Sequence, residues 1–200
     1  MLRDFARRTQ PLPALRRTSA ATDALRLERV AAGDVQAFEA LYRDYHPRLH
    51  RFLGLMASNG PLIEEVMNDT MLVVWKRAGT YNGACKVSTW IFAIAYRTAL
   101  KALSRRDDLS EEVPADEMAS VDPGPEQRRS AAETSAALRR SLDGLTAEQR
   151  SVLVLTYFHD LPCAEIAEIV GCPVDTVKTR MFHGRRRLRA LLSGELEDWL

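Results

Sequence analysis

Apolar residues recur at helical spacings along most of the chain. Between residues 27 and 106 they fall three or four positions apart, as in the series Phe38, Leu41, Tyr42, Tyr45, Leu49, Phe52, Leu53 and Met56. This spacing places them on one face of a helix. No alternation with a period of two, which half-buried strands show, competes with it. The pattern predicts an all-α fold.

Turn residues divide the first half of this pattern into elements. Asn59-Gly60-Pro61 interrupts the helical spacing, and Pro61 suits the first turn of a helix over about 62–77. A loop over 79–83 then precedes a helix over about 87–104. In the second half, Thr146 and Gln149 have the spacing of a capping box, which predicts a helix from there to about Phe158.

An acidic segment separates the two halves. Residues 107–126 carry eight acidic side chains and no basic one, with three prolines and almost no apolar periodicity. Such a stretch buries too little surface to offset its ordering entropy, so it is expected to be a flexible linker. The chain is thus expected to have four parts: a flexible basic extension (1–27), a helical domain (28–106), an acidic linker (107–128) and a second helical domain (129–200).

Composition excludes several classes of protein. The three cysteines, Cys85, Cys163 and Cys172, form no CxxC pair, so reduced, partly buried thiols are expected rather than disulfides or a metal site. No apolar run is long enough to span a membrane, and the first 26 residues do not have the pattern of a secretory signal. Neither a phosphate-binding loop nor a known hydrolase motif is present. A cytoplasmic protein without catalytic residues, metal or cofactor is expected.

The C-terminal residues predict a helix-turn-helix made of helices over about 163–170 and 174–192. Gly171 suits the tight turn between them, because that turn needs a positive φ. In the second helix one face is small or apolar, with Val177, Met181, Gly184 and Leu188. The opposite face is cationic, hydroxylated and aromatic, with Lys178, Thr179, Phe182, His183 and Arg186. Residues 176–192 carry six Lys or Arg and no acid, which favours duplex DNA as the ligand over a merely solvated face.

The run LIEEVMNDTMLVVW (62–75) combines an apolar stripe with a polar face. Ile63, Val66, Thr70 and Val74 form the stripe, whereas Glu64, Glu65, Asn68 and Asp69 crowd the exposed side. Like charges four residues apart slightly destabilise an isolated helix, which favours a basic partner surface there. A plain solvated face remains the alternative.

The helix over 87–104 has the opposite character. Trp90, Ile91, Ile94 and Ala95 are expected on its buried side, while Arg97, Lys101 and Arg105 line up at steps of four. Tyr81, Trp90, Phe92 and Tyr96 supply aromatic rings beside this basic row. Such a combination suits single-stranded nucleic acid, in which bases stack on rings and cations follow phosphates. The alternative is that these rings belong to the core.

In their order and spacing these segments resemble the extracytoplasmic-function (ECF) sigma factors of bacterial RNA polymerase. The resemblance rests on DVQAFEALYRDYHPRLHRFL (34–53), on 62–75, on STWIFAIAYRTAL (88–100) and on the helix-turn-helix. It implies that the first domain binds core polymerase and the minus-ten element, and that the second binds the minus-thirty-five element. It also implies transcription initiation in a stress response and control by an anti-sigma factor.

The resemblance implies a role for individual residues. Those that would contact core polymerase are Glu64, Glu65, Asn68, Asp69 and Trp75. Those that would contact minus-ten DNA are Tyr81, Asn82, Lys86, Val87, Trp90, Arg97 and Lys101. Those that would contact minus-thirty-five DNA are Lys178, Thr179, Arg180, Phe182, His183 and Arg186. The sequence leaves one alternative open, a dimeric helix-turn-helix regulator that binds an operator without polymerase.

Overall fold

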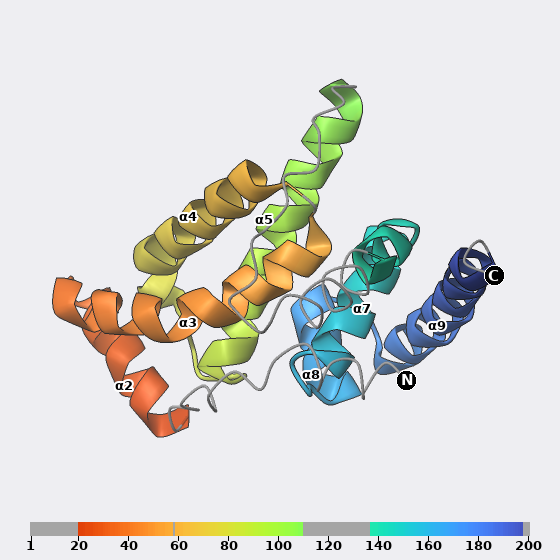
Figure 1. Ribbon diagram of the computed structural model, residues 1–200. Helices are drawn as coiled ribbons and strands as arrows, with labels where there is room; N and C mark the ends of the chain where they lie inside the picture. Colours follow the sequence, from red (N-terminus) through yellow and green to blue (C-terminus); the bar gives the residue numbers. More distant parts are fainter. Residues whose placement is uncertain (1–19, 58, 110–136, 198–200) are drawn as a thin grey trace, which may run out of the picture.

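A computed structural model of the chain describes residues 20–57, 59–109 and 137–197, in which the regular structure is helical and no strand occurs. The helices form two groups that lie side by side (Figure 1). The first group contains α2 (Ala20–Ala31), α3 (Val35–Met56), α4 (Gly60–Arg77), a short 3-10 turn η1 (Ala78–Thr80) and α5 (Val87–Leu109). The second contains a helical segment at 137–143, α7 (Ala147–Tyr157), α8 (Cys163–Val170) and α9 (Val174–Glu197). The all-α prediction is confirmed.

The starts of α3, α4 and α7 are fixed by short polar side chains. Asp34 accepts a hydrogen bond from the backbone N–H of Ala37 (3.0 Å), and Asn59 accepts one from Leu62 (3.1 Å). Thr146 accepts one from the N–H of Gln149 at 3.3 Å, as the capping motif predicts. Each bond satisfies a donor that has no partner inside its helix.

Residues 20–27 correct one prediction, because they were assigned to the flexible extension and instead form the first turns of α2. The carboxylate of Asp23 is buried and accepts a 2.7 Å hydrogen bond from the hydroxyl of Tyr45 on α3. Arg26 pairs with Asp44 of α3 at 2.5 Å, and Leu27 is buried in the core. These charged side chains of α2 thus bind α3, and its apolar side chain Leu27 packs in the core. Residues 1–19 lie outside the described part.

The acidic linker also begins later than expected, because α5 continues to Leu109. Its remaining residues, 110–128, lie outside the described part of the chain. Among the described helices, none is long and apolar enough to cross a lipid bilayer.

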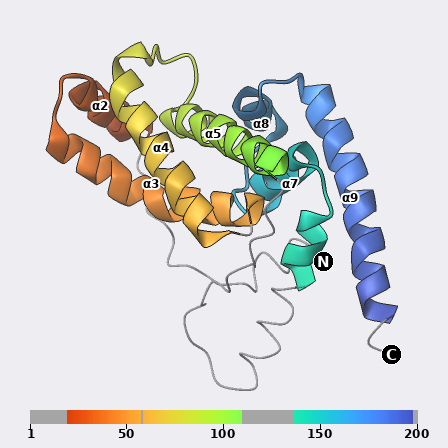
Figure 2. The ribbon, with the colours of Figure 1, turned by 90° about the horizontal axis from the view of Figure 1, so that it is seen from above.

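The two groups of helices pack directly against each other and share one cluster of buried apolar side chains. In this arrangement α8 lies on α5, and α7 lies on α3. Figures 1 and 2 both show α9 on the outer side of the C-terminal group, with α7 and α8 between it and α5. The packing leaves α9 at the surface of the molecule.

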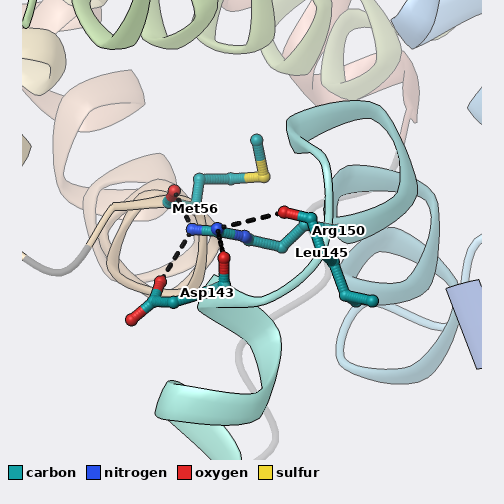
Figure 3. A network of polar contacts seen from close by, with 4 residues as sticks. All are labelled: Met56, Asp143, Leu145 and Arg150. Carbon is teal, nitrogen blue, oxygen red and sulfur yellow. Dashed lines mark hydrogen bonds and ion pairs between the residues drawn. The ribbon is translucent and has the colours of Figure 1, made fainter. Parts of the chain in front are cut away.

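Arg150 of α7 is a polar centre of this interdomain contact (Figure 3). Its guanidinium donates to the carbonyl of Met56 at the C-terminal end of α3 (2.8 Å), and to the carboxylate of Asp143 (2.9 Å). It also donates to the carbonyls of Asp143 (3.1 Å) and Leu145 (3.4 Å). Because the last carbonyls of a helix lack partners and carry partial negative charge, a cation placed there ties α7 to the end of α3.

Candidate nucleic-acid interface

The turn between α8 and α9 has the geometry that the sequence predicts. Gly171 ends α8 in the left-handed region, with φ 68° and ψ 39°. Its N–H and that of Cys172 both donate to the carbonyl of Ala167, at 2.9 and 3.2 Å. A Cβ at Gly171 would meet no atom within 4 Å, so backbone conformation, and not space, makes glycine the suitable residue. The turn lets α9 leave at an angle to α8.

The two faces of α9 are separated as predicted. Val177, Met181, Gly184 and Leu188 are buried, and Gly184 allows close packing because a Cβ there would lie 3.1 Å from Leu153 of α7. The exposed side chains are Lys178, Thr179, Phe182, His183 and Arg186. Phe182 is 56% exposed, so its ring is available to a ligand. Arg180 is half-buried, with a guanidinium nitrogen 3.7 Å from the sulfur of Cys172.

Asp175, which the sequence did not single out, lies one turn before Lys178 and pairs with it at 2.9 Å. Through this hydrogen bond, each partner stabilises the other's charge: the pKa of Lys178 is raised and that of Asp175 is lowered. Because the pair is exposed, it contributes little stability. A phosphate can therefore displace Asp175 at small cost.

A groove of about 510 Å³ runs between the start of α7 and the second half of α9, and its lining residues are Gly144, Thr146, Gln149, His183, Arg186, Arg187 and Ala190. The backbone N–H groups at the start of α7 carry partial positive charge, which adds to the two arginines. The Gly144 turn approaches α9 closely, since a Cβ there would lie 2.6 Å from a Leu191 methyl, which would have to move. The groove is thus an electropositive concavity beside the exposed face of α9.

In the N-terminal group, the loop before α5 contains two internal hydrogen bonds that involve side chains. The hydroxyl of Tyr81 donates to the carbonyl of Cys85 (2.5 Å), and the side chain of Asn82 accepts from the N–H of Ala84 (3.1 Å). Gly83 has a φ of 75°, and the ring of Tyr81 packs edge-on against Trp90 with centroids 5.8 Å apart. Val87 is buried, so it anchors the loop rather than presenting a side chain to solvent.

The basic row on α5 is exposed, but not all its neighbouring rings are accessible. Arg97, Lys101 and Arg105 are exposed as predicted. Phe92 and Tyr96 are buried, which corrects the expectation that they flank the row as accessible rings; Tyr81 and Trp90 are half-buried. Lys86 is paired with Glu165 of α8, a partner that no local pattern indicates. Docking of the C-terminal group thus occupies one of the predicted DNA-binding cations.

On α4, Glu64, Glu65, Asn68 and Asp69 are exposed, and Ile63, Val66, Thr70 and Val74 are buried. Both stripes are as predicted. The side chain of Leu72 is 48% exposed, and its position places it on the same side of the helix as Glu65 and Asp69. Trp75 is half-buried against Phe38, with ring centroids 5.2 Å apart. An acidic face with an apolar component is suited to a basic protein partner.

The three cysteines are free and half-buried, as expected. Across the described ranges, no group of three or more His, Cys, Asp or Glu side chains is arranged to hold a metal ion.

Two family models match the chain, and each coincides with one group of helices. "Sigma-70 region 2" matches residues 41–108 and "Sigma-70, region 4" matches residues 135–188. The alternative of a conventional operator-binding regulator is not favoured, because a sigma region occupies the domain that it would assign to an effector or to dimerisation.

Two relatives and two solved structures agree with these matches. The ECF sigma factor SigM of Mycobacterium tuberculosis is 31% identical over 171 residues, which cover 86% of this chain and 85% of the relative. The ECF sigma factor RpoE of Cereibacter sphaeroides is 31% identical over 163 residues, which cover 80% and 88%. CnrH in complex with the cytosolic domain of CnrY has a TM-score of 0.65 at 20% identity, covering 86% of this chain and 98% of that one. The sigma factor RpoE of Bartonella quintana, in complex with the anti-sigma factor NepR, has a TM-score of 0.65 at 21% identity, covering 80% of this chain and 98% of that one. Both structures therefore have the same fold as this chain. The chain belongs to the ECF family of RNA polymerase sigma factors.

Proposed function

We propose that this chain is a non-enzymatic promoter-specificity subunit that acts in the cytoplasm, with α4 docked on core RNA polymerase, α5 and its preceding loop on the minus-ten element, and α9 on the minus-thirty-five element. The observation that carries this proposal is the division of α9 into a buried apolar face and an exposed cationic one, with Phe182 left 56% exposed. An exposed ring beside Lys178 and Arg186 gives this face an apolar contact for a base as well as cations for phosphates.

Two weak DNA contacts become one selective contact when both domains are mounted on a larger protein. Mounting fixes their separation, so the second contact forms at a high effective concentration. In this proposal polymerase holds the two groups of helices at the distance between the two promoter elements, and free sigma factor binds promoter DNA poorly.

The minus-ten contact requires opened DNA, and opening costs about 1.4 kcal/mol for each stacking step. The preformed loop at Tyr81–Cys85 offers a rigid site for an unstacked base, because its two internal hydrogen bonds fix it before DNA arrives. The exposed cations Arg97 and Lys101 lie on the following helix and would hold the backbone of the freed strand.

The minus-thirty-five contact would use the exposed face of α9 in the major groove. The cation of Lys178 suits a phosphate or a guanine edge, and the hydroxyl of Thr179 suits any base edge. The apolar ring of Phe182 suits the methyl group of thymine. The electropositive groove beside Arg186 and Arg187 would receive a backbone phosphate.

We also propose that an anti-sigma factor controls this chain. The solved structures with the same fold include CnrH bound to CnrY, and the sigma factor RpoE bound to the anti-sigma factor NepR. The acidic face of α4 with exposed Leu72 is the surface that such an inhibitor would have to cover to prevent docking on polymerase.

A gel shift with and without core polymerase tests the proposal. Promoter fragments are expected to be bound strongly only when core enzyme is present, and run-off transcription is expected to require the chain. Tight, dimeric binding to DNA by the free chain, without any effect of core enzyme, would instead support an operator-binding regulator.

Replacing Lys178 by alanine is expected to weaken holoenzyme binding to its promoter and to make it less sensitive to salt. Loss of one phosphate contact makes the negative slope of log affinity against log salt less steep by about 0.9. Asp175→Asn is expected to have the opposite effect and to strengthen promoter binding. It removes the ion pair with Lys178 and a negative charge near DNA. An unchanged slope in Lys178→Ala would show that this side chain does not contact a phosphate.

A further inference from the structure

His159, in the turn after α7, lies in the contact between the two groups of helices. Its ring packs edge-on against Phe52 of α3 (6.1 Å between centroids) and against Phe92 of α5 (5.0 Å). Its Nε2 atom is buried and has no hydrogen-bond partner among the residues that the structure describes. A half-buried aromatic ring from the C-terminal group therefore packs against two rings of the N-terminal group, and its buried Nε2 is left unsatisfied among the described residues.

The charged groups that act on this ring make protonation unfavourable. Arg48 and Arg51 of α3 are both cations, and the Arg48 guanidinium stands 5.4 Å from the centre of the Phe92 ring. From α5 the facing group is the apolar ring of Phe92, and the nearest titratable residue along that helix is the buried Tyr96. The next residue in the chain, Asp160, is exposed. Burial, followed by the two arginines, lowers the pKa of His159 to about 3.

We propose that neutral His159 is a pH-sensitive latch that holds the C-terminal domain on α3 and α5, and that acidification through the ordinary histidine range separates the two domains. A third cation beside Arg48 and Arg51, without a partner for Nε2, cannot remain between two phenylalanine rings. Separation would break the ion pair between Lys86 and Glu165, and the proposed function places the loop that carries Lys86 on minus-ten DNA. This last consequence rests on the proposed function, whereas the latch itself does not.

The direction of the pH effect follows from the two states of the ring. In the separated state His159 is in water, with a pKa near the ordinary 6.5, while in the docked state its pKa is about 3. Docking is therefore most stable above pH 6.5 and loses stability as the pH falls from there towards the docked value. With these values, the equilibrium constant for separation rises about thirtyfold from pH 7.5 to 5.0.

Urea titrations of the full chain at both pH values measure this change even if separation is rare in water. Dyes on Lys76→Cys in α4 and Ala190→Cys in α9, with the three native cysteines replaced by alanine, report domain separation by energy transfer. Far-UV circular dichroism reports helix loss in the same samples. The lower limit of pH 5.0 keeps Asp and Glu carboxylates largely ionised.

At pH 5.0 we expect energy transfer to be lost at a lower urea concentration than helix content. In the labelled chain that keeps His159, the equilibrium constant for separation is expected to change about thirtyfold between the two pH values. His159→Phe keeps a ring in the pocket and cannot titrate, and His159→Gln is a second neutral variant; both are expected to lose most of this pH dependence. The other histidines are present in every variant, so their contributions cancel. An equal pH dependence in both variants, or coincident loss of energy transfer and helix content at both pH values, would overturn the latch. Because no polymerase or DNA is present, failure here leaves the transcription test unaffected.

Discussion

Charge reversal on α4, by Glu65→Lys together with Asp69→Lys, is expected to abolish co-purification with core RNA polymerase while leaving the fold intact. Both side chains are exposed, so neither substitution removes a buried contact. At an interface with a basic partner, each new lysine would face like charge, which costs several kcal/mol in total. A loss of that size lowers affinity by at least about a hundredfold.

The matched control is Glu28→Lys with Glu39→Lys, which changes the net charge equally at exposed positions of α2 and α3. The measurement is retention of core polymerase on immobilised sigma factor, with circular dichroism of each variant. If the α4 variant retained core enzyme as well as the control, the docking surface would lie elsewhere. Leu72→Ala on the same face is expected to weaken retention less, because it removes apolar area without adding charge.

Arg150→Met is expected to lower the free energy of unfolding by about 2–3 kcal/mol, since it leaves buried carbonyls without donors. Methionine keeps much of the side-chain volume but offers no N–H group to Met56, Asp143 or Leu145. The effect is expected in both domains, because the arginine fixes the turn before α7 and also holds the C-terminal end of α3. Urea unfolding of the full chain measures it.

Arg43→Met on the exposed side of α3 is the control for this substitution and is expected to change stability by less than about 0.5 kcal/mol. If Arg150→Met were equally neutral, water would be replacing the guanidinium, and the contact would contribute little to the docking of the two domains. Unlike His159, Arg150 is charged at every accessible pH, so its contribution is not expected to change between pH 5.0 and 7.5.

Helices, their faces and their caps could be predicted from sequence because they depend on residues three or four positions apart. The spacing of Val177, Met181 and Leu188 identifies the buried side of α9, and the positive φ of Gly171 follows from the turn that two adjoining helices need. The exposed acids of α4 and cations of α5 follow from the same periodicity. Leu72 and Asp175 were also accessible to this reasoning, since each lies at helical spacing from a predicted site residue, but they were not identified as part of those surfaces.

Only the tertiary structure decided which of these faces meet. The first turns of α2 were assigned to a basic extension. Their stabilising contacts could not be read from neighbouring residues, because Asp23 and Arg26 bind Tyr45 and Asp44 on another helix. Phe92 and Tyr96 appeared available for stacking until the C-terminal group was seen to pack against α5. The bond from Arg150 to Met56 joins residues 94 positions apart, and Lys86 finds Glu165 across 79. Contacts at such separations depend on the complementary shape and charge of whole surfaces, which local periodicity does not encode.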